Sequence, residues 1–485
     1  MSSVIEKNKF YPMYINGEWV GENLTEFTDV LNPATKEVVG IIPRGGKEEA
    51  ELAVDAAFDA FKSWSKKTAE ERSNLLMKWF NLIEEEKEEI GKLMTMEQGK
   101  PLNEAIGEMS YANSFIKWYA EEAKRVYGET IPASATNKRL LVRKEPVGVI
   151  AAITPWNFPA AMITRKVGPA LAAGCTAVVK PAEQTPLTAL KLAELAEKAG
   201  IPKGVFNVVT GKASAIGEAW MKDSRVRKIT FTGSTEVGKI LMRQAADNVK
   251  KISLELGGNA PFIVMDDANL EKAAKNLVAS KFRNAGQTCI CTNRVYVHEN
   301  VKEEFVELFK KELSGLKVGN GLEEGTGIGP LIDGAAVEKV QSLIEDAEKK
   351  GATIVYRGEK PAGANGYFYE PTIMTNVHED MLCIKEEIFG PLAPIVSFTT
   401  EEEVIRQAND TNFGLAAYIF TENLSRAIRI SEALEYGIVG LNDGLPSTAQ
   451  APFGGYKESG LGREGGHHGI EEYLETKYIS IGFDE

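Results

Sequence analysis

The chain has 485 residues, of which 43% are hydrophobic and 26% are charged, and its formal net charge is −13. This length exceeds what a single hydrophobic core usually supports, so we expect a globular protein of two or three domains. The acidic balance argues against a nucleic-acid partner, because binding a polyanion requires a basic surface. No apolar run approaches the ~18 residues of a membrane span, so we expect no membrane partner.

The cysteines and histidines are few and scattered, with four of each. The cysteine spacing argues against a disulfide framework, and the first ten residues lack the apolar stretch of a secretion signal. We therefore expect a cytoplasmic location. The histidines show no metal-ligand spacing, so we expect no metal site.

The first 125 residues are predicted to be mainly helical after a short hairpin. Residues 14–20 carry Asn-Gly between apolar side chains, the strongest short signal for a β-hairpin. Apolar residues recur at helical spacing over 47–64, and a capping box at Thr68 begins a second helix that runs to about residue 97. A third amphipathic helix covers about 102–124, where we interpret Tyr111 and the other aromatic residues as core.

After an extended ribbon at 138–144, the pattern changes to alternating strands and helices. Five short apolar strands are predicted at 147–153, 175–180, 205–209, 228–231 and 251–255, with helices between them. This rhythm predicts a parallel, doubly wound sheet with ligands at the carboxyl ends of its strands. A second alternating region covers about 260–436, and the tail at 475–482 is expected to pair with the ribbon near Leu141.

Three local features carry candidate chemistry. Cys289 lies near the basic residues Arg283 and Arg294, which could hold its thiol as the nucleophilic thiolate, although a small semi-buried cysteine is the commoner case. Glu255 ends an apolar strand before two glycines. It could be simply an exposed carboxylate, or it could be a general base that faces the thiol. The turn at 233–238 opens a helix as a phosphate site does, but an ordinary glycine turn fits equally.

Seven motifs stand in an order that is much more specific than any one of them. They are Thr154-Pro155-Trp156-Asn157-Phe158-Pro159, Lys180-Pro181-Ala182-Glu183, Phe231-Thr232-Gly233-Ser234-Thr235, Leu254-Glu255-Leu256-Gly257-Gly258, Gly286-Gln287-Thr288-Cys289, Glu387-Ile388-Phe389-Gly390-Pro391 and Pro452-Phe453-Gly454-Gly455. Together they resemble the aldehyde dehydrogenase superfamily from about residue 15 to residue 479.

The resemblance implies an α/β fold with two doubly wound α/β domains, one for the cofactor and one for catalysis, plus a small β oligomerisation ribbon. The implied NAD-binding domain covers 1–124 and 147–256, and the catalytic domain covers 257–458. The ribbon and C-terminal segment are 125–146 and 459–485. The ribbon implies a homo-oligomer, either a dimer or a tetramer.

The resemblance also assigns catalytic roles. Cys289 matches the nucleophile that attacks an aldehyde carbon. Asn157, with the backbone N–H of Cys289, would hold the resulting oxyanion, and such a donor typically contributes ~3 kcal/mol. Glu255 would activate the water that hydrolyses the thioester, which favours hydrolysis over acyl transfer to coenzyme A.

The cofactor implied by the family is a nicotinamide dinucleotide. Glu183 favours NAD over NADP, since a carboxylate binds both ribose hydroxyls but repels a 2′-phosphate, and the nearby Lys180 leaves NADP use open. The expected cofactor-binding residues are Ile153, Thr154, Pro155, Trp156, Lys180, Ala182, Glu183, Gly211, Phe231, Thr232, Gly233, Ser234, Val237, Leu256, Gly257, Glu387 and Phe389.

For the substrate, the segments around Arg165 and Arg283 resemble those of succinate-semialdehyde dehydrogenases, as does Ser447. Two guanidinium groups in one pocket would bind a carboxylate, so we expect succinate semialdehyde to be oxidised to succinate. The loop at 443–450 departs from the expected pattern. Glutarate semialdehyde, another ω-oxo acid or a general aldehyde therefore remain alternatives. The two arginines could instead be surface residues or be ion-paired within the protein.

Cys291 is predicted to be either a small packing residue or a redox partner of Cys289, through a strained disulfide. Two other classes compete with the dehydrogenase. A cysteine hydrolase would need a histidine beside the thiol, and no Asn-His pair marks one. A non-catalytic cofactor-binding protein would not need Cys289, Glu255 and Asn157 together.

Overall fold

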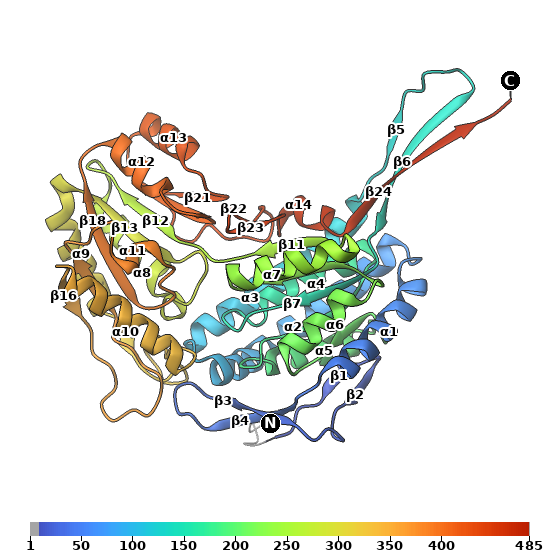
Figure 1. Cartoon of the computed structure of the whole chain (residues 1–485), viewed down its shortest axis with the longest axis horizontal. Coiled ribbons are helices and arrows are strands. Elements are labelled where there is room, and N and C mark those ends of the chain that lie inside the picture. Colours follow the sequence, from blue (N-terminus) through green and yellow to red (C-terminus); the bar gives the residue numbers. More distant parts are fainter. Residues whose placement is uncertain (1–8, 485) are drawn as a thin grey trace.

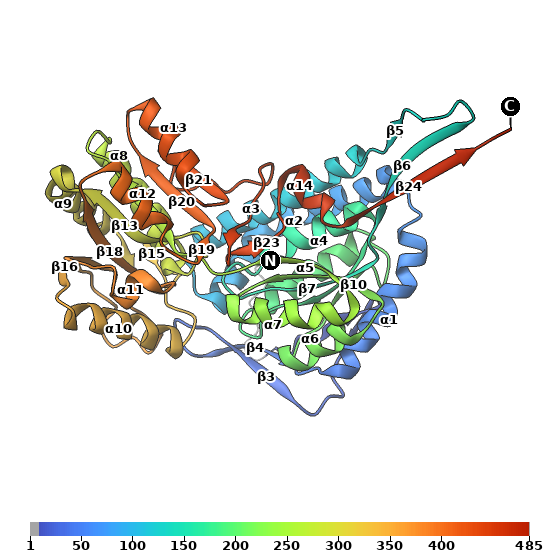
Figure 2. The ribbon, with the colours of Figure 1, turned by 45° about the horizontal axis from the view of Figure 1, so that its top comes forward.

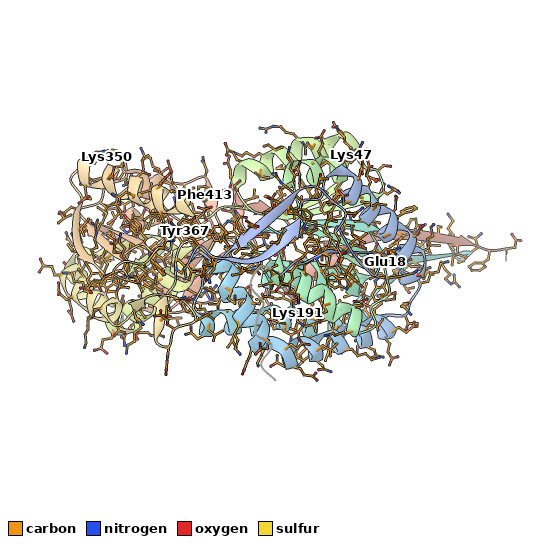
Figure 3. All side chains as sticks on the ribbon, turned by 90° about the horizontal axis from the view of Figure 1, so that it is seen from below. Glu18, Lys47, Lys191, Lys350, Tyr367 and Phe413 are labelled. Atoms are coloured by element: carbon orange, nitrogen blue, oxygen red, sulfur yellow. The ribbon has the colours of Figure 1, made fainter. Side chains whose placement is uncertain are left out.

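The structure, a computed structural model, describes residues 9–484. It has two α/β lobes, each built on its own sheet, and a β-ribbon that projects away from both (Figure 1). The ribbon remains clear of the lobes when the molecule is turned (Figure 2). Side chains pack between the lobes, and Tyr367 and Phe413 of the second lobe lie near their junction (Figure 3).

The first lobe is organised around an eight-stranded sheet whose five central strands are parallel. In spatial order the strands are β2 (Glu18–Val20), β1 (Met13–Ile15), β9 (Phe206–Val208), β8 (Thr176–Lys180), β7 (Val149–Ile153), β10 (Val226–Thr232), β11 (Lys251–Glu255) and β23 (Gly460–Leu461). The chain runs outward from β7 through β8 to β9 and then returns to the other side of β7. This reversal creates a crevice at the carboxyl ends of β7 and β10, where open α/β sheets bind ligands.

Helices cover both faces of this sheet. One face packs on α1 (Lys47–Trp64), α6 (Ala213–Lys222) and α7 (Thr235–Ala245), which is followed by η2 (Ala246–Asn248). The other face packs on α4 (Ala161–Ala173) and α5 (Leu187–Lys198), with α2 (Ala69–Gln98), α3 (Leu102–Glu122) and η1 (Ala123–Arg125). The predicted capping box is present at the start of α2, since the backbone N–H of Glu71 donates to Thr68 Oγ1 and the backbone N–H of Thr68 donates to Glu71 Oε2.

The second lobe has a seven-stranded sheet that is parallel except at one edge. Its strands, in spatial order, are β16 (Thr353–Arg357), β17 (Thr372–Thr375), β18 (Leu392–Phe398), β13 (Thr292–His298), β12 (Ala260–Val264), β20 (Ala416–Phe420) and β21 (Ile438–Leu441). Its helical segments are α8 (Leu270–Phe282), η3 (Arg283–Gly286), η4 (Glu299–Val301), α9 (Lys302–Ser314), α10 (Gly334–Lys349), α11 (Leu382–Lys385), α12 (Glu401–Asn409) and α13 (Leu424–Ala433).

The ribbon consists of β5 (Glu129–Ile131), β6 (Lys138–Pro146) and β24 (Leu474–Gly482). Ile479 lies opposite Leu141, so the predicted pairing of the tail with the ribbon is confirmed. The short helix α14 (Gly466–Glu471) precedes β24. Three further strand pairs are β3 (Phe27–Leu31) with β4 (Val38–Pro43), β14 (Lys317–Val318) with β15 (Thr326–Ile328), and β19 (Phe413–Gly414) with β22 (Tyr456–Lys457).

The predicted fold class, two doubly wound α/β units and a ribbon, is confirmed. The C-terminal segment also does more than build the ribbon, because β23 pairs with β11 and places Gly460 opposite Glu255. Within residues 9–484, no helix is both long and apolar enough to cross a bilayer. The same residues contain no group of three or more His, Cys, Asp or Glu side chains that could hold a metal ion.

Candidate active site

Two neighbouring cavities lie at the crevice between β7 and β10, closed on one side by the second lobe. The inner cavity has a volume of about 380 Å³ and contains Cys289. The outer cavity has a volume of about 600 Å³ and contains Lys180 and Glu183. Ile332 and Asp333 border both, so the two cavities form one elongated site.

Most of the expected cofactor residues line these cavities. The inner cavity brings together Pro155, Trp156, Asn157, Thr232, Gly233, Ser234, Leu256, Gly257, Cys289, Glu387 and Phe389. The outer cavity brings together Ile153, Thr154, Lys180, Ala182 and Glu183. These residues come from loops far apart in the sequence, which meet because parallel strands present their carboxyl ends at one edge of the sheet.

Three expected cofactor residues do not line either cavity. Gly211 lies against the backbone of Gly45, where a Cβ would come within 2.2 Å of the Gly45 carbonyl oxygen. Phe231 packs its ring beneath Gly233. Val237 lies in the first turn of α7 and is 42% exposed.

Cys289 lies on the loop between η3 and β13 and is partly exposed. Burial raises the pKa of its thiol to about 12, and Arg165 only partly opposes this rise. The expectation that nearby charge holds the thiolate is therefore wrong for this site, because desolvation outweighs the attraction of the guanidinium. Neither Arg283 nor Arg294 is the main positive neighbour of this sulfur. A base must remove the proton before the sulfur can attack.

The glycines after Glu255 allow the two lobes to approach closely at the thiol. A Cβ on Gly258 would lie 2.3 Å from the carbonyl oxygen of Cys289, and a Cβ on Gly257 would lie 3.1 Å from Glu387 Oε2. Only glycine fits the first of these positions without moving the backbone.

Glu255 ends β11 and is 3% exposed, and its Oε2 has no hydrogen-bond partner among the described residues. Burial raises the pKa of Glu255 well above its usual range, and Glu464 adds to the rise. Glu464 itself is held below its usual pKa by Lys166 and Arg165, in spite of its burial. Two buried carboxyl groups in neighbouring positions thus differ in protonation, and Glu255 is the one that can take up a proton.

Arg165 lies in α4 and is 1% exposed, with Nη2 at 2.7 Å from Glu464 Oε2 and its guanidinium carbon 3.9 Å from the Phe453 ring centre. Arg283 is half-buried, and its guanidinium carbon lies 5.0 Å from the centre of the Phe158 ring. Within the described chain Arg283 forms no salt bridge. Of the two expected substrate arginines, Arg165 is already ion-paired and Arg283 is the one left for a ligand.

Tyr111 joins these arginines, although its aromatic spacing suggests core. Burial raises the pKa of the Tyr111 phenol, while the charges of Arg165 and Arg283 and the hydroxyl of Ser447 oppose the rise. The Ser447 hydroxyl is buried. Tyr111 is therefore within electrostatic reach of both guanidinium groups and of the Ser447 hydroxyl, although none of these four residues lines the inner or the outer cavity. Periodicity alone could not separate Tyr111 from its helical neighbours.

In the outer cavity, Lys180 is 3% exposed and its Nζ lies 3.8 Å from Glu183 Oε1. Burial lowers the pKa of Lys180 to about 8, although Glu183 opposes the change. Glu183 is half-buried, and its Oε1 accepts a hydrogen bond of 3.4 Å from the backbone N–H of Ala213. Both side chains reach the cavity from the loop after β8.

At the inner cavity, Glu387 is half-buried and accepts a hydrogen bond of 3.0 Å from the backbone N–H of Gly258. Burial raises its pKa to about 7. The rings of Trp156 and Phe389 meet edge to face, with their centres 5.5 Å apart. Phe389 has a φ of 52°, a strained conformation that a non-glycine residue adopts only when its surroundings impose it.

The second lobe contributes residues that the sequence did not single out. They are Ile332, Asp333, Ala335, Ala336 and Lys339 around the start of α10. Asp333 caps α10 by accepting from the backbone N–H of Ala336 at 2.9 Å. Only the approach of the two lobes places this helix start beside the loops of the first sheet.

The elongated site fits a dinucleotide. Ser234 caps the start of α7 beside Gly233, so the backbone N–H groups and the dipole of this helix can receive a pyrophosphate. Thr154 Oγ1 is buried and has no partner among the described residues. A polar atom left unpaired at the cavity wall indicates a ligand that supplies the missing bond.

Comparisons with known proteins agree with this geometry. A sequence model described as the aldehyde dehydrogenase family matches residues 19–479. The chain is 58% identical to the NADP(+) succinate-semialdehyde dehydrogenase of Escherichia coli, over 96% of this chain and 97% of that protein. It is 57% identical to a glutarate-semialdehyde dehydrogenase of Pseudomonas putida, over 96% of this chain and 97% of that protein. A solved structure of a succinate-semialdehyde dehydrogenase from Burkholderia pseudomallei matches with a TM-score of 0.97 at 53% identity, covering 100% of this chain and 99% of that one.

Proposed function

Because this chain belongs to the aldehyde dehydrogenase family, we propose that it oxidises succinate semialdehyde to succinate with NAD as the preferred cofactor. The observation that carries the substrate proposal is the group formed by Arg165, Arg283, Tyr111 and Ser447, in which Arg165 is also the positive neighbour of Cys289. Its charge and hydrogen-bond donors suit an aldehyde that ends in a carboxylate. The names of the relatives at 58% and 57% identity point to the same class of substrate.

The proposed reaction uses Glu255 twice, first as the base for the thiol and then as the base for the water. Glu255 accepts the proton of the Cys289 thiol, since burial raises the pKa of its carboxyl and so makes its carboxylate a stronger base. The sulfur attacks the aldehyde carbon, while Asn157 Nδ2 and the backbone N–H of Cys289 hold the oxyanion. The bound nicotinamide supplies the hydride acceptor. Loss of the hydride from the adduct leaves a thioester on Cys289. Glu255 releases the thiol proton to solvent, and its carboxylate then deprotonates the water that hydrolyses this thioester.

NAD is preferred in this proposal because Glu183 faces the outer cavity with a carboxylate. A 2′-phosphate placed there would be repelled, and Lys180, the cation beside it, has a pKa of about 8 and is already near Glu183. The name of the Escherichia coli relative carries NADP(+), so the preference has to be measured. A several-fold higher kcat/KM with NADP than with NAD would overturn this part of the proposal.

The substrate is tested by replacing Arg283, which forms no salt bridge with the residues that the structure describes. Arg283→Ala should raise KM for succinate semialdehyde by about ten-fold to a hundred-fold, since a hydrogen bond to a charged group is lost. It should change KM for hexanal little. Arg426→Ala, on a remote ion pair with Asp266 and Asp267, is the matched control. Equal effects of Arg283→Ala on both aldehydes would contradict carboxylate recognition.

Chain length needs a separate comparison, because the relatives include enzymes named for both four-carbon and five-carbon semialdehydes. We expect a higher kcat/KM for succinate semialdehyde than for glutarate semialdehyde. The reverse order would favour the alternative, a longer ω-oxo acid, and would locate the cause in the loop at 443–450.

We also propose that the chain forms a homo-oligomer through its ribbon. Tyr478 and Ile481 on β24 and Ile131 on β5 are 58%, 42% and 39% exposed, on strands that project from the lobes. Exposed apolar side chains on a projecting sheet are typical of a protein interface. Light scattering of the full chain should report a dimer or tetramer, and Tyr478→Lys should shift it toward the monomer.

A further inference from the structure

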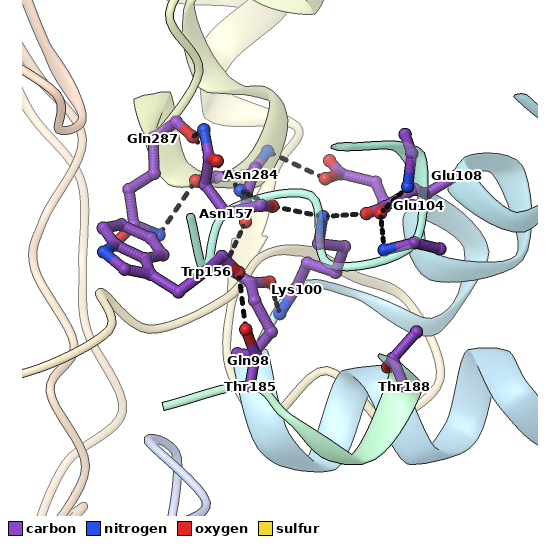
Figure 4. A network of polar contacts seen from close by, with 12 residues as sticks. Gln98, Lys100, Glu104, Glu108, Trp156, Asn157, Thr185, Thr188, Asn284 and Gln287 are labelled. Carbon is purple, nitrogen blue, oxygen red and sulfur yellow. Dashed lines mark hydrogen bonds and ion pairs between the residues drawn. The ribbon is translucent and has the colours of Figure 1, made fainter. Parts of the chain in front are cut away.

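The oxyanion-binding side chain, Asn157, is attached to the rest of the protein by a buried polar network (Figure 4). Its Nδ2 donates to the backbone carbonyl of Gln287 at 3.0 Å, two residues before Cys289. This bond uses one N–H of the amide and leaves the second for an oxyanion. The position of that second N–H therefore depends on how the Asn157 loop and the Gln287 loop are held together.

One amide group joins the two loops. Asn284 Nδ2 donates to the backbone carbonyl of Asn157 at 3.0 Å and to that of Gln287 at 3.3 Å. Asn284 lies in η3 with φ 51° and ψ 37°, a left-handed conformation that asparagine tolerates better than most residues. Its backbone N–H donates to Glu104 Oε2 at 2.8 Å, which ties η3 to α3.

The last residue of α2, Gln98, holds the side-chain amide of Asn284 in place. Gln98 Nε2 donates to Asn284 Oδ1 at 2.9 Å, and the backbone N–H of Lys100 donates to Gln98 Oε1 at 3.0 Å. The Gln98 bond determines which way the Asn284 amide faces, because only the oxygen can accept it. Gln98 is fully buried, and within the described chain its side chain hydrogen-bonds to Asn284 and to the backbone of Lys100, neither of which is expected to react.

Lys100 holds the same carbonyl from another side. Its Nζ donates to the backbone carbonyl of Asn157 at 2.7 Å and pairs with Glu108. Glu108 in turn accepts from the backbone N–H groups of Ala160 and Ala161, at the start of α4. The backbone carbonyl of Asn157 thus receives two buried donors, from Lys100 and Asn284, and neither is needed to satisfy a helix or a sheet.

We propose that Gln98, Lys100 and Asn284 are positioning residues that fix the oxyanion-binding amide of Asn157 relative to the Cys289 loop. The role rests on the proposed dehydrogenase reaction but not on its substrate. A displacement of about 1 Å at such a group can cost a hundred-fold in rate, so anchors of this kind act on kcat rather than on substrate affinity. Their loss should slow every reaction at Cys289 that passes through an oxyanion.

The test uses three reactions of Cys289. Oxidation of hexanal with NAD and acylation by p-nitrophenyl acetate without cofactor both form an oxyanion, whereas alkylation by iodoacetamide does not. Gln98→Met should lower kcat for hexanal and the acylation rate by about ten-fold or more, with KM nearly unchanged. Alkylation of Cys289 should stay within about two-fold of wild type, since the thiol itself is not moved. Hexanal keeps the result independent of succinate semialdehyde.

A double-mutant cycle separates positioning from general loss of structure. In an Asn157→Ala background, Gln98→Met should cost little further activity, because the amide it positions is gone. Asn113→Ala is the matched control, since Asn113 is a buried amide that bonds Phe80 and Glu84, away from Cys289. It should lower the thermal unfolding temperature without slowing acylation.

Asn284→Asp is the second variant, since aspartate also tolerates the left-handed conformation but cannot donate to the two carbonyl oxygens. It should slow acylation at least as much as Gln98→Met, again without slowing alkylation. The proposal is wrong if both variants are acylated at rates within about two-fold of wild type. It is also wrong if Gln98→Met lowers activity in the Asn157→Ala background by the same factor as in wild type.

Discussion

The inner and outer cavities share a wall but differ in how they hold charge. At the inner cavity, Cys289, Glu255 and Glu387 are desolvated, and their pKa values are all raised by burial. At the outer cavity, Glu183 is half-buried and lies within 3.8 Å of Lys180. The comparison indicates that burial raises the proton affinity of the groups at the inner cavity, whereas the outer cavity presents a carboxylate and a cation side by side to a ligand.

The largest effect is expected at the nucleophile. Cys289→Ser should lower kcat by at least about a thousand-fold, because a serine hydroxyl is a far weaker acid than a thiol and gives up its proton to Glu255 far less readily. Formation of NADH from an aldehyde, followed by absorbance, measures it. Cys175→Ser, at a buried cysteine remote from the cavities, should retain activity. Activity in Cys289→Ser comparable to wild type would remove the inner cavity from catalysis.

The next effect tests proton transfer at Glu255. Glu255→Gln should lower kcat by about a hundred-fold or more. Because the pKa of Glu255 is raised, its basic form appears only as pH rises through that raised value, so wild-type kcat should increase with pH. This ascending limb should disappear in Glu255→Gln. A limb that persists unchanged would assign the titration to another group.

A substitution at the outer cavity should have a smaller effect than those at Cys289 and Glu255, and the effect should be on the KM of the cofactor. Glu183→Ser removes the carboxylate that opposes a 2′-phosphate, and should improve kcat/KM for NADP by about ten-fold while weakening NAD. Steady-state kinetics with both cofactors at fixed aldehyde measures the change. Since Glu183 lies outside the inner cavity, kcat at saturating NAD should stay near wild type. A large fall in that kcat would mean that the two cavities are not separable.

The smallest effect on catalysis is expected at Cys291. This thiol donates to the backbone carbonyl of Gly286 at 3.1 Å, and Lys281 Nζ lies 3.9 Å from its sulfur. Cys291→Ala should leave kcat within about two-fold of wild type, because this sulfur is buried and lines neither cavity. If Cys291 is a redox partner of Cys289, peroxide should inactivate wild type reversibly and the variant irreversibly, with dithiothreitol as the probe. Identical recovery in both would leave Cys291 as a packing residue.

Local patterns in the sequence were sufficient for much of the fold. The Asn16-Gly17 hairpin forms with φ values of 56° and 77°, and the capping box at Thr68 begins a helix that ends at Gln98, one residue beyond the predicted end. The alternation from β7 to β11 forms a parallel sheet in the order expected of a doubly wound fold. These features depend on spacing, turn chemistry and burial on one face, all of which neighbouring residues specify.

The candidate site was only partly accessible from the sequence. The motif residues do gather at the two cavities, because strand ends of one parallel sheet share an edge. The start of α10 reaches the inner cavity only through the packing of the lobes, and Tyr111 reaches Ser447 only through the placement of α3. Contacts between elements hundreds of residues apart leave no local periodicity.

What the sequence determined by itself is the order of elements and the identity of the groups that can react. The tertiary structure alone decided which of these groups carry charge and which buried hydrogen bonds hold them in position. Cys289 lies near guanidinium groups in the sequence, but burial prevails and keeps its thiol protonated. In the sequence, Gln98 is a single amide on a helix, and nothing there indicates a role for it. In the structure it orients Asn284, which in turn bonds the Asn157 loop. The reason is physical, since desolvation and long-range hydrogen bonds depend on what the folded chain places around a group.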